Sequence, residues 1–357
     1  MKSKYGALAA IILCVTLGFL PISGIIKVIG IIIISITILY VNRSMYYFIK
    51  GNRIYMSKKI ENKDKTWECY RKAYNANLID KYKVTMASIL IQKNDHNFGG
   101  QILDSVIEKS KDKKLVKLAK IQKSMVFQLN GDIEKSIEIL EEVRHGGYCD
   151  KNLMINLGTY VLYQNDLKKA KELIKDTKKD ENTSSGIADN HGWYWILTGQ
   201  WEKAHTLYLD ILDRKPRFPD PYVHAAQVFL HYNNLEKAIE CLKEAVSKTW
   251  TNTIFFKQDI LTQMINGLES ENKEYIATCI NESVEDVAKG NTYTLLDENE
   301  AKNIMNKPKD KEPIVEKSDT ESEDLEEQEE QTLESIDDEL PNTELTEEDL
   351  KWEEEHQ

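Results

Sequence analysis

Apolar and polar positions recur with a 34-residue period over residues 131–245. Each repeat has a turn residue, a small residue five places later, and a large apolar or aromatic residue four places after that. The three sets are Gly131, Asn165, Gly199 and Asn233; Ser136, Ala170, Ala204 and Ala238; and Leu140, Ile174, Tyr208 and Leu242. A period of this length indicates one supersecondary unit stacked on copies of itself.

Each unit is expected to be a pair of antiparallel helices. Segments with helical apolar spacing lie before and after each turn, as residues 154–163 and 167–174 do around Asn165. Glycine and asparagine tolerate the left-handed backbone that ends a helix. The small residues then allow the two helices of a unit to approach closely. The sequence therefore predicts an all-α array in which no pair buries its apolar face alone.

The pattern resembles the tetratricopeptide repeat, whose form is W-x2-L-G-x2-Y followed by Ala, an aromatic residue and a late Pro. Leu157-Gly158 matches the L-G pair, with Val161 at the Tyr position, and Pro216 fills the late Pro position. The first Trp of the pattern is replaced by Met154, Ala188 and Tyr222. The resemblance is strong over residues 117–250 and implies a right-handed α-solenoid with a concave, peptide-binding groove.

The flanking regions extend this organisation. Residues 46–250 are expected to hold about six helical pairs, with a 37-residue offset before Ser136 explained by a longer loop near 109–114. Residues 251–268 and 272–289 have helical patterns. They would form capping helices, within residues 251–289, that give the end of the solenoid a more polar outer face.

The chain begins with two apolar stretches, at residues 5–22 and 25–41, joined by a Pro-Ile-Ser-Gly turn. The first interpretation is a transmembrane helical hairpin within residues 1–45. The first stretch is uninterrupted over residues 6–20, whereas the second contains Lys27 near its start. The two helices would span only roughly 22–26 Å, against about 30 Å for a bilayer core. The second interpretation is a signal peptide at 6–20, which no small-x-small cleavage site supports.

Positive charges flank the apolar stretches on both outer sides. Lys2 and Lys4 precede the first stretch, and Arg43, Lys50 and Arg53 follow the second. Because such residues stay on the cytoplasmic side, the expected localisation is a two-span protein of the cell membrane. Its repeats and both termini would lie in the cytoplasm. If only one stretch spans the bilayer, an extracytoplasmic location of the repeats is the alternative.

The two parts of the chain differ sharply in charge. Residues 291–357 contain 25 acidic and 6 basic residues, while the first 290 residues carry a net charge of +7. Residues 290–357 are predicted to form a disordered acidic tail, because they have too few apolar residues to offset the entropy of ordering. The tail is either a solubilising extension or holds a short interaction motif at 335–352. No dense basic stripe with interleaved aromatics favours nucleic-acid binding.

Motifs for catalysis are absent from the sequence. It has no phosphate-binding glycine loop, no G-x-S-x-G and no H-E-x-x-H. The five cysteines are widely spaced, which favours reduced thiols in the cytosol. His224 and His231 share a helix face without a third ligand, and Cys149 has no partner base. The sequence therefore predicts no catalytic, cofactor or metal site; an enzyme without readable motifs is the weaker alternative.

The tetratricopeptide resemblance implies that the first helix of each unit lines the groove. Carried onto this chain, the candidate groove residues are Ile121, Met125, Ile155, Thr159, Leu162, Tyr163, Trp193, Ile196, Val223, Gln227, Leu230 and His231. They are mostly apolar with aromatic edges, which favours an apolar or amphipathic peptide over an acidic one. The chain's own cap helices could also occupy the groove, or the groove could be unused.

These features predict a membrane-anchored scaffold that recruits or stabilises a protein partner at the bilayer. The main alternative is an extracytoplasmic assembly factor with a signal peptide or a single-span anchor. The sequence does not indicate whether the protein is a monomer or an oligomer.

Overall fold

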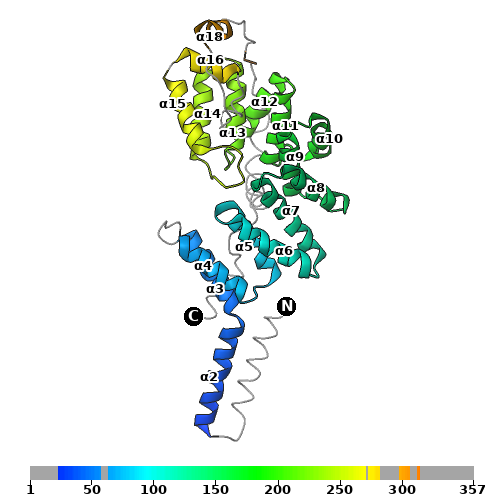
Figure 1. Ribbon diagram of the computed structural model, residues 1–357, viewed down its shortest axis with the longest axis vertical. Coiled ribbons are helices and arrows are strands. Elements are labelled where there is room, and N and C mark those ends of the chain that lie inside the picture. The colour runs from blue at the N-terminus through cyan, green and yellow to red at the C-terminus, as the bar shows by residue number, and fades with distance from the viewer. Residues whose placement is uncertain (1–22, 58–62, 271, 282–296, 306–311, 314–357) are drawn as a thin grey trace, which may run out of the picture.

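The computed structural model describes residues 23–57, 63–270, 272–281, 297–305 and 312–313, and within these ranges the regular secondary structure is entirely helical. Figure 1 shows the helices in chain order. They are α2 (Gly24–Val41), α3 (Arg43–Met56), α4 (Lys63–Asn75), α5 (Asp80–Lys93), α6 (His96–Lys109), α7 (Lys113–Leu129), α8 (Ile133–His145), α9 (Lys151–Tyr163), α10 (Leu167–Thr177), the 3-10 helix η2 (Lys178–Asp180), α11 (Ser185–Leu197), α12 (Trp201–Asp213), α13 (Asp220–His231), α14 (Leu235–Ser247), α15 (Gln258–Glu269), α16 (Lys273–Asn281) and α18 (Glu298–Met305).

The periodic region folds as helix pairs, as the sequence predicts. The turn residues all adopt left-handed backbone, with φ values of 81° at Gly131, 58° at Asn165, 69° at Gly199 and 61° at Asn233. The small residues at 136, 170, 204 and 238 are at most 2% exposed. They lie where the second helix of each pair meets the first. The expectation of an all-α, tetratricopeptide-like solenoid is confirmed.

Side-chain caps fix where the second helices begin. The Asp132 and Asp166 carboxylates accept hydrogen bonds from the backbone N–H groups of Lys135 and Lys169, at 3.0 and 3.1 Å. Asn234 caps α14 in the same way. Because each such cap stabilises a helix by about 1 kcal/mol, the turn residue and the capping residue after it set the boundary locally.

The 37-residue offset has a different cause from the one the sequence suggested. The connection between α6 and α7 is short, at residues 110–112, so the prediction of a longer loop near 109–114 is wrong. Helix α7 instead has 17 residues, against 13 in α9 and α11. An additional turn of helix, about 3.6 residues, accommodates the inserted positions.

Helices α3 and α4 form a further pair at the start of the array. Tyr70 is fully buried between them, and its hydroxyl donates to Asn52 Oδ1 at 2.5 Å. Gly51 makes room for the ring, since a Cβ there would lie 2.7 Å from Tyr70 Cδ1. Phe48 contacts Tyr70 and also Tyr82 of α5, with ring centroids 6.1 and 5.1 Å apart. The segment that follows α2 therefore packs as part of the repeats.

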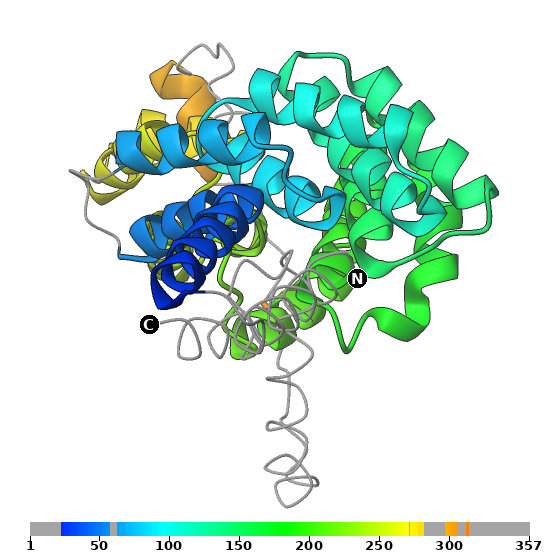
Figure 2. The same cartoon turned by 90° about the horizontal axis from the view of Figure 1, so that it is seen from below.

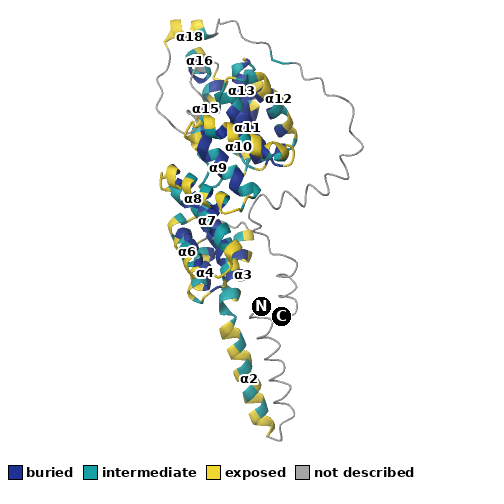
Figure 3. Cartoon of the chain, turned by 90° about the vertical axis from the view of Figure 1, so that its right-hand side faces the viewer, coloured by how far each residue is buried: buried dark blue, intermediate teal, exposed yellow. Residues whose placement is uncertain are grey.

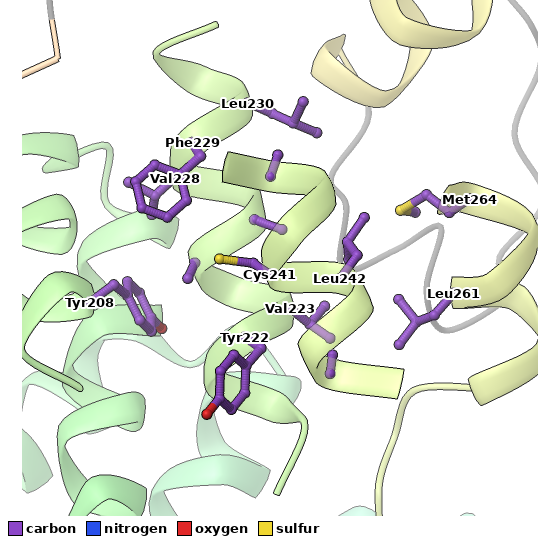
Figure 4. Close-up of a cluster of buried hydrophobic side chains, with 14 of the residues drawn as sticks. Tyr208, Tyr222, Val223, Val228, Phe229, Leu230, Cys241, Leu242, Leu261 and Met264 are labelled. Atoms are coloured by element: carbon purple, nitrogen blue, oxygen red, sulfur yellow. The ribbon is translucent and has the colours of Figure 1, made fainter. Parts of the chain in front are cut away.

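The apolar core runs along the array as adjoining clusters. Each cluster combines side chains from successive pairs, so that every pair is covered by its neighbours. Figure 4 shows Leu242 of α14 beside Leu261 and Met264 of α15, all three fully buried. Helix α15 thus covers the last repeat, in the manner expected of a solenoid cap.

Helix α2 extends away from the array (Figures 1 and 3). None of its residues is buried, and Ile25 is 75% exposed. Within the described ranges it is the one helix long and apolar enough to cross a membrane, with a mean hydropathy of 2.5, judged by length and composition alone. The stretch at 5–22 lies outside the described residues, so the transmembrane hairpin stays a prediction.

Two expectations for the C-terminal region are wrong in part. Residues 251–257 are not helical, and α15 begins only at Gln258. Helix α18 lies inside the region predicted to be disordered from residue 290; Ala301 within it is 2% exposed, and α18 packs against α16. The carboxylate of Asp297 accepts from the backbone N–H groups at the start of this helix. The predicted helix at 282–289 and most of the tail lie outside the described residues.

Candidate functional site: the inner face of the solenoid

Seen from below, the pairs follow a curved path (Figure 2). The curvature brings residues 249–257, which connect α14 to α15, against α5 near the start of the array. The backbone N–H of Asn252 donates to Gln92 O at 2.8 Å, and its Nδ2 donates to Ile91 O at 3.1 Å. The Lys93 ammonium donates to the carbonyl of Trp250. Residues about 160 positions apart in the chain are thus joined directly.

Two phenylalanines of the same segment contact other repeats. The ring of Phe255 stacks on Tyr163 of α9, with centroids 4.1 Å apart and an angle of 20° between the planes. It also meets Tyr160 edge-on at 6.3 Å. Phe256 is 6% exposed and meets the His224 ring of α13 at 5.6 Å. Aromatic pairs of this kind contribute about 0.5–1.5 kcal/mol each beyond their buried area.

These contacts identify one shared surface. A run of seven residues reaches at most about 25 Å, yet residues 250–256 contact the first helices of three different pairs, α5, α9 and α13. Those helices must therefore face a common interior. We call this surface, formed by α5, α9 and α13 around residues 249–257, the inner face.

The predicted groove residues divide into three groups. Tyr163 is 40% exposed and lies directly against Phe255. Partly buried residues are Ile155, Thr159, Ile196 and His231. The remaining seven residues are buried, each at most 9% exposed: Ile121, Met125, Leu162, Trp193, Val223, Gln227 and Leu230. The third group packs inside the protein and would reach a partner only if neighbouring segments moved; its role in binding stays a prediction.

A buried polar network joins helices α11, α12 and α13. Asp189 Oδ1 accepts from the Tyr208 hydroxyl at 3.1 Å and lies 2.9 Å from His224 Nδ1. The indole of Trp193 stacks on His224, with centroids 4.9 Å apart. Burial, and then the nearby Asp189 charge, raise the pKa of Asp220 to about 7. The network links α11, α12 and α13 and leaves Trp193 and His224 engaged in packing.

A second network surrounds His191 on α11. Its Nε2 lies 2.8 Å from Thr177 Oγ1, and its Nδ1 contacts the carboxylate of Glu181. Burial lowers the pKa of His191, although the Glu181 carboxylate opposes the shift. The imidazole therefore acts as a neutral link between α10, η2 and α11.

The remaining chemistry-bearing side chains do not form a reactive cluster in the part of the chain that the structure describes. No group of three His, Cys, Asp or Glu residues there could hold a metal ion. His231 stacks on Trp201, with centroids 3.9 Å apart, and does not join His224. Burial raises the pKa of the Cys149 thiol and raises that of Cys241 to about 12, so these thiols stay protonated near neutral pH.

The left-handed turn and the small contact residue between the two helices of a pair both recur every 34 residues. These helical pairs have a tetratricopeptide-like fold. No family model matches the sequence, and no curated protein matches it.

Solved structures resemble the chain in fold. One is the crystal structure of YrrB, a tetratricopeptide protein with an unusual peptide-binding site; it is 18% identical, covers 50% of this chain and 90% of its own, and has a TM-score of 0.35. Another is the TPR2AB-domain:pHSP90 complex of yeast Sti1; it is 14% identical, covers 64% of this chain and 95% of its own, and has a TM-score of 0.27. Both TM-scores are below 0.5, so the likeness to tetratricopeptide repeats rests on the helix-pair geometry of this chain itself.

The sequence prediction missed the segment that fills the inner face. Residues 251–268 were expected to form a continuous helix, because Ile254, Phe255 and the later apolar residues fit a helical pattern. The sequence evidence against a continuous helix over residues 251–268 lies in its first three residues. Thr251, Asn252 and Thr253 favour turns over helix interiors, and they come directly after the tetratricopeptide period stops.

Proposed function

We propose that this protein is an interaction scaffold whose inner face binds an extended peptide segment carrying aromatic side chains. The observation that carries the proposal is the chain's own segment 249–257, which already occupies that face. It is held by backbone hydrogen bonds at Asn252 and by ring contacts at Phe255 and Phe256. Main-chain pairing with side-chain pockets is a common mode of peptide recognition. A partner of similar chemistry would displace the segment.

We further propose that α2 tethers the repeats to the cell membrane, on the cytoplasmic side. Its 18 residues extend about 27 Å, close to the thickness of a bilayer core. Directly after it, the Arg43 guanidinium lies 3.7 Å from the Tyr40 ring centroid and donates to Tyr40 O at 2.8 Å. An aromatic residue beside a cation suits the membrane interface, and Arg43, Lys50 and Arg53 favour a cytoplasmic location. Tethering would raise the effective concentration of the repeats towards other membrane proteins.

A peptide added in trans tests the inner face. A labelled synthetic peptide of residues 249–258 is expected to bind the Phe255→Ala variant about fivefold more tightly than the unchanged protein, which corresponds to about 1 kcal/mol of lost stacking. The reason is that the intact segment competes at an effective concentration of about 1 mM, and the substitution removes its stacking on Tyr163. Fluorescence anisotropy titration measures both affinities.

Two controls accompany this titration. Lys257→Ala, at an exposed position in the same segment, should leave the peptide affinity as weak as in the unchanged protein. A peptide with both phenylalanines replaced by alanine should bind no variant. If the Phe255→Ala variant fails to bind the peptide, residues 249–257 only stabilise the fold, and the inner face is not a peptide-binding site.

Removal of the tether has a separate readout. A chain beginning at Arg43 is expected to move from the membrane pellet to the soluble fraction, because the exposed apolar helix is gone. Immunoblotting after carbonate washing measures the distribution, and reporter fusions at Gly24 and Lys289 measure topology. An extracytoplasmic signal at Lys289 would favour the assembly-factor alternative and contradict the cytoplasmic scaffold.

A further inference from the structure

The carboxylate of Glu312, which lies outside the helices, reaches back to the repeats. Its Oε1 accepts from Lys237 Nζ at 2.8 Å and lies 3.1 Å from His205 Nε2. Its Oε2 accepts from Asn234 Nδ2 at 2.8 Å. The three partners come from α12, from the cap of α14 and from α14 itself. A residue 75–107 positions further along the chain is therefore held at three points.

Aromatic contacts within the repeats position His205 and Lys237 independently of Glu312. His205 is 2% exposed, and its ring meets those of Phe229 and Tyr232 edge-on, at 5.8 and 5.3 Å. The Lys237 ammonium lies 5.1 Å from the centre of the Phe229 ring. These contacts form an aromatic base beneath the cationic and hydrogen-bonding groups.

The capping role of Asn234 orients its amide. Its Oδ1 accepts from the backbone N–H of Lys237 at 3.2 Å, as the cap of α14, so the Nδ2 donor points away from the helix towards Glu312. The N-terminus of α14 adds a partial positive charge at the same place. All of the contacts that reach Glu312 thus suit an anion.

The other tetratricopeptide turns do not offer this combination. At the place of Asn234, the two earlier caps are Asp132 and Asp166, whose negative charges would repel a carboxylate. Position 200 is Gln200, whose side chain makes no cap bond. The equivalent of His205 one repeat earlier is Lys171, which is exposed. The donor set is specific to the turn between α13 and α14.

The charge state of the bound group agrees with this geometry. Burial alone would raise the pKa of Glu312, but hydrogen bonds from Lys237, Asn234 and His205 outweigh it and lower the pKa to about 2. Glu312 is therefore ionised near neutral pH. Its neighbour Pro313 restricts the backbone on that side, which reduces the entropy lost when the segment docks.

We propose that His205, Asn234 and Lys237 form a carboxylate-binding pocket for a glutamate–proline segment, and that Glu312–Pro313 of the same chain is its resident ligand. The pocket holds Glu312 against α12 and α14 of the last repeats. It lies at a helix-pair turn and does not depend on what the inner face binds.

A peptide of residues 309–317 tests the pocket in the full-length protein. The Glu312→Gln variant is expected to bind this peptide at least tenfold more tightly than the unchanged protein, because its own ligand no longer competes at an effective concentration of about 1 mM. Adding Lys237→Met to Glu312→Gln should remove the binding. Anisotropy titration measures the affinities, and circular dichroism with thermal melting verifies that each variant is folded.

A matched control uses the equivalent lysine one repeat earlier. Lys203→Met in the Glu312→Gln background should leave peptide binding unchanged, since Lys203 donates to Gln200, whereas Lys237 is the lysine that donates to Glu312. The peptide with glutamine at position 312 should not bind. Equal peptide binding by the unchanged protein and Glu312→Gln, or equal losses from the two lysine substitutions, would overturn the pocket. A dimer that Glu312→Gln abolishes would show instead that a second copy supplies the glutamate, and would overturn the assignment within one chain.

Discussion

Replacing Tyr208 with alanine is expected to lower the free energy of unfolding by about 3–5 kcal/mol, as for other large aromatic side chains removed from cores. Tyr208 is 1% exposed, and its ring lies directly against Gly192 of α11, where a Cβ would come within 2.6 Å of Tyr208 Cζ. The substitution leaves a cavity between α11 and α12 and removes one hydrogen bond from the buried Asp189. Urea unfolding followed by circular dichroism measures the change.

Two tyrosine variants separate packing from hydrogen bonding. Tyr208→Phe keeps the ring and loses the hydroxyl, so it should cost about 1 kcal/mol. Tyr163→Ala removes a ring that is 40% exposed and should also cost only about 1 kcal/mol, largely its stacking with Phe255. Equal losses for Tyr208→Ala and Tyr163→Ala would contradict the packing between repeats described above. Because the apolar core of each repeat packs mainly on its neighbours, Tyr208→Ala should also broaden the transition.

Replacing Asp220 with asparagine is expected to change how stability depends on pH. The pKa of Asp220 is about 7 in the folded protein, raised from 3.8 by burial and by Asp189. A group whose folded pKa is raised contributes stability below its unfolded pKa and loses it as pH rises through the folded pKa. The unchanged protein should therefore lose stability between about pH 4 and pH 7, whereas the variant should not. The full shift corresponds to about 4 kcal/mol; partial exposure of Asp220 reduces the expected difference to about 2 kcal/mol.

Urea midpoints measured from pH 4 to pH 8 test this expectation. The stability of Asp220→Asn relative to the unchanged protein should rise across that interval and level off above pH 7. Asp259→Asn is a matched control, since Asp259 lies in the first turn of α15 at an exposed position. Its profile should run parallel to that of the unchanged protein. A parallel profile for Asp220→Asn would show that Asp220 is already ionised in the fold at low pH.

Much of the helical architecture could be predicted from the sequence, because its signals act over short distances. The turn residues Gly131 and Asn165 and the caps that follow them end one helix and begin the next within a few residues. The second apolar stretch, expected at 25–41, forms α2 at Gly24–Val41. In each case the residues that determine the element lie inside it or beside it.

The candidate site was predicted less well. Helical spacing placed Tyr163 and Trp193 in the same class of groove residue, yet Trp193 is 3% exposed and Tyr163 is 40% exposed. The difference arises because Trp193 is covered by His224 of the next repeat, whereas Tyr163 faces a segment from the far end of the array. A periodic pattern identifies equivalent positions but not what covers each one.

The sequence by itself determined that this chain is an array of tetratricopeptide-like helix pairs, since each pair is specified by turn, cap and small residues within one 34-residue period. Only the tertiary structure decided what fills the inner face and what holds Glu312. Those contacts join positions such as Ile91 and Asn252, or His205 and Glu312. Small rotations between successive repeats add up to the curvature that brings α5 to residue 252. The Glu312 contact in turn requires the chain to fold back onto an earlier repeat. No local pattern of residues predicts either of these two long-range contacts.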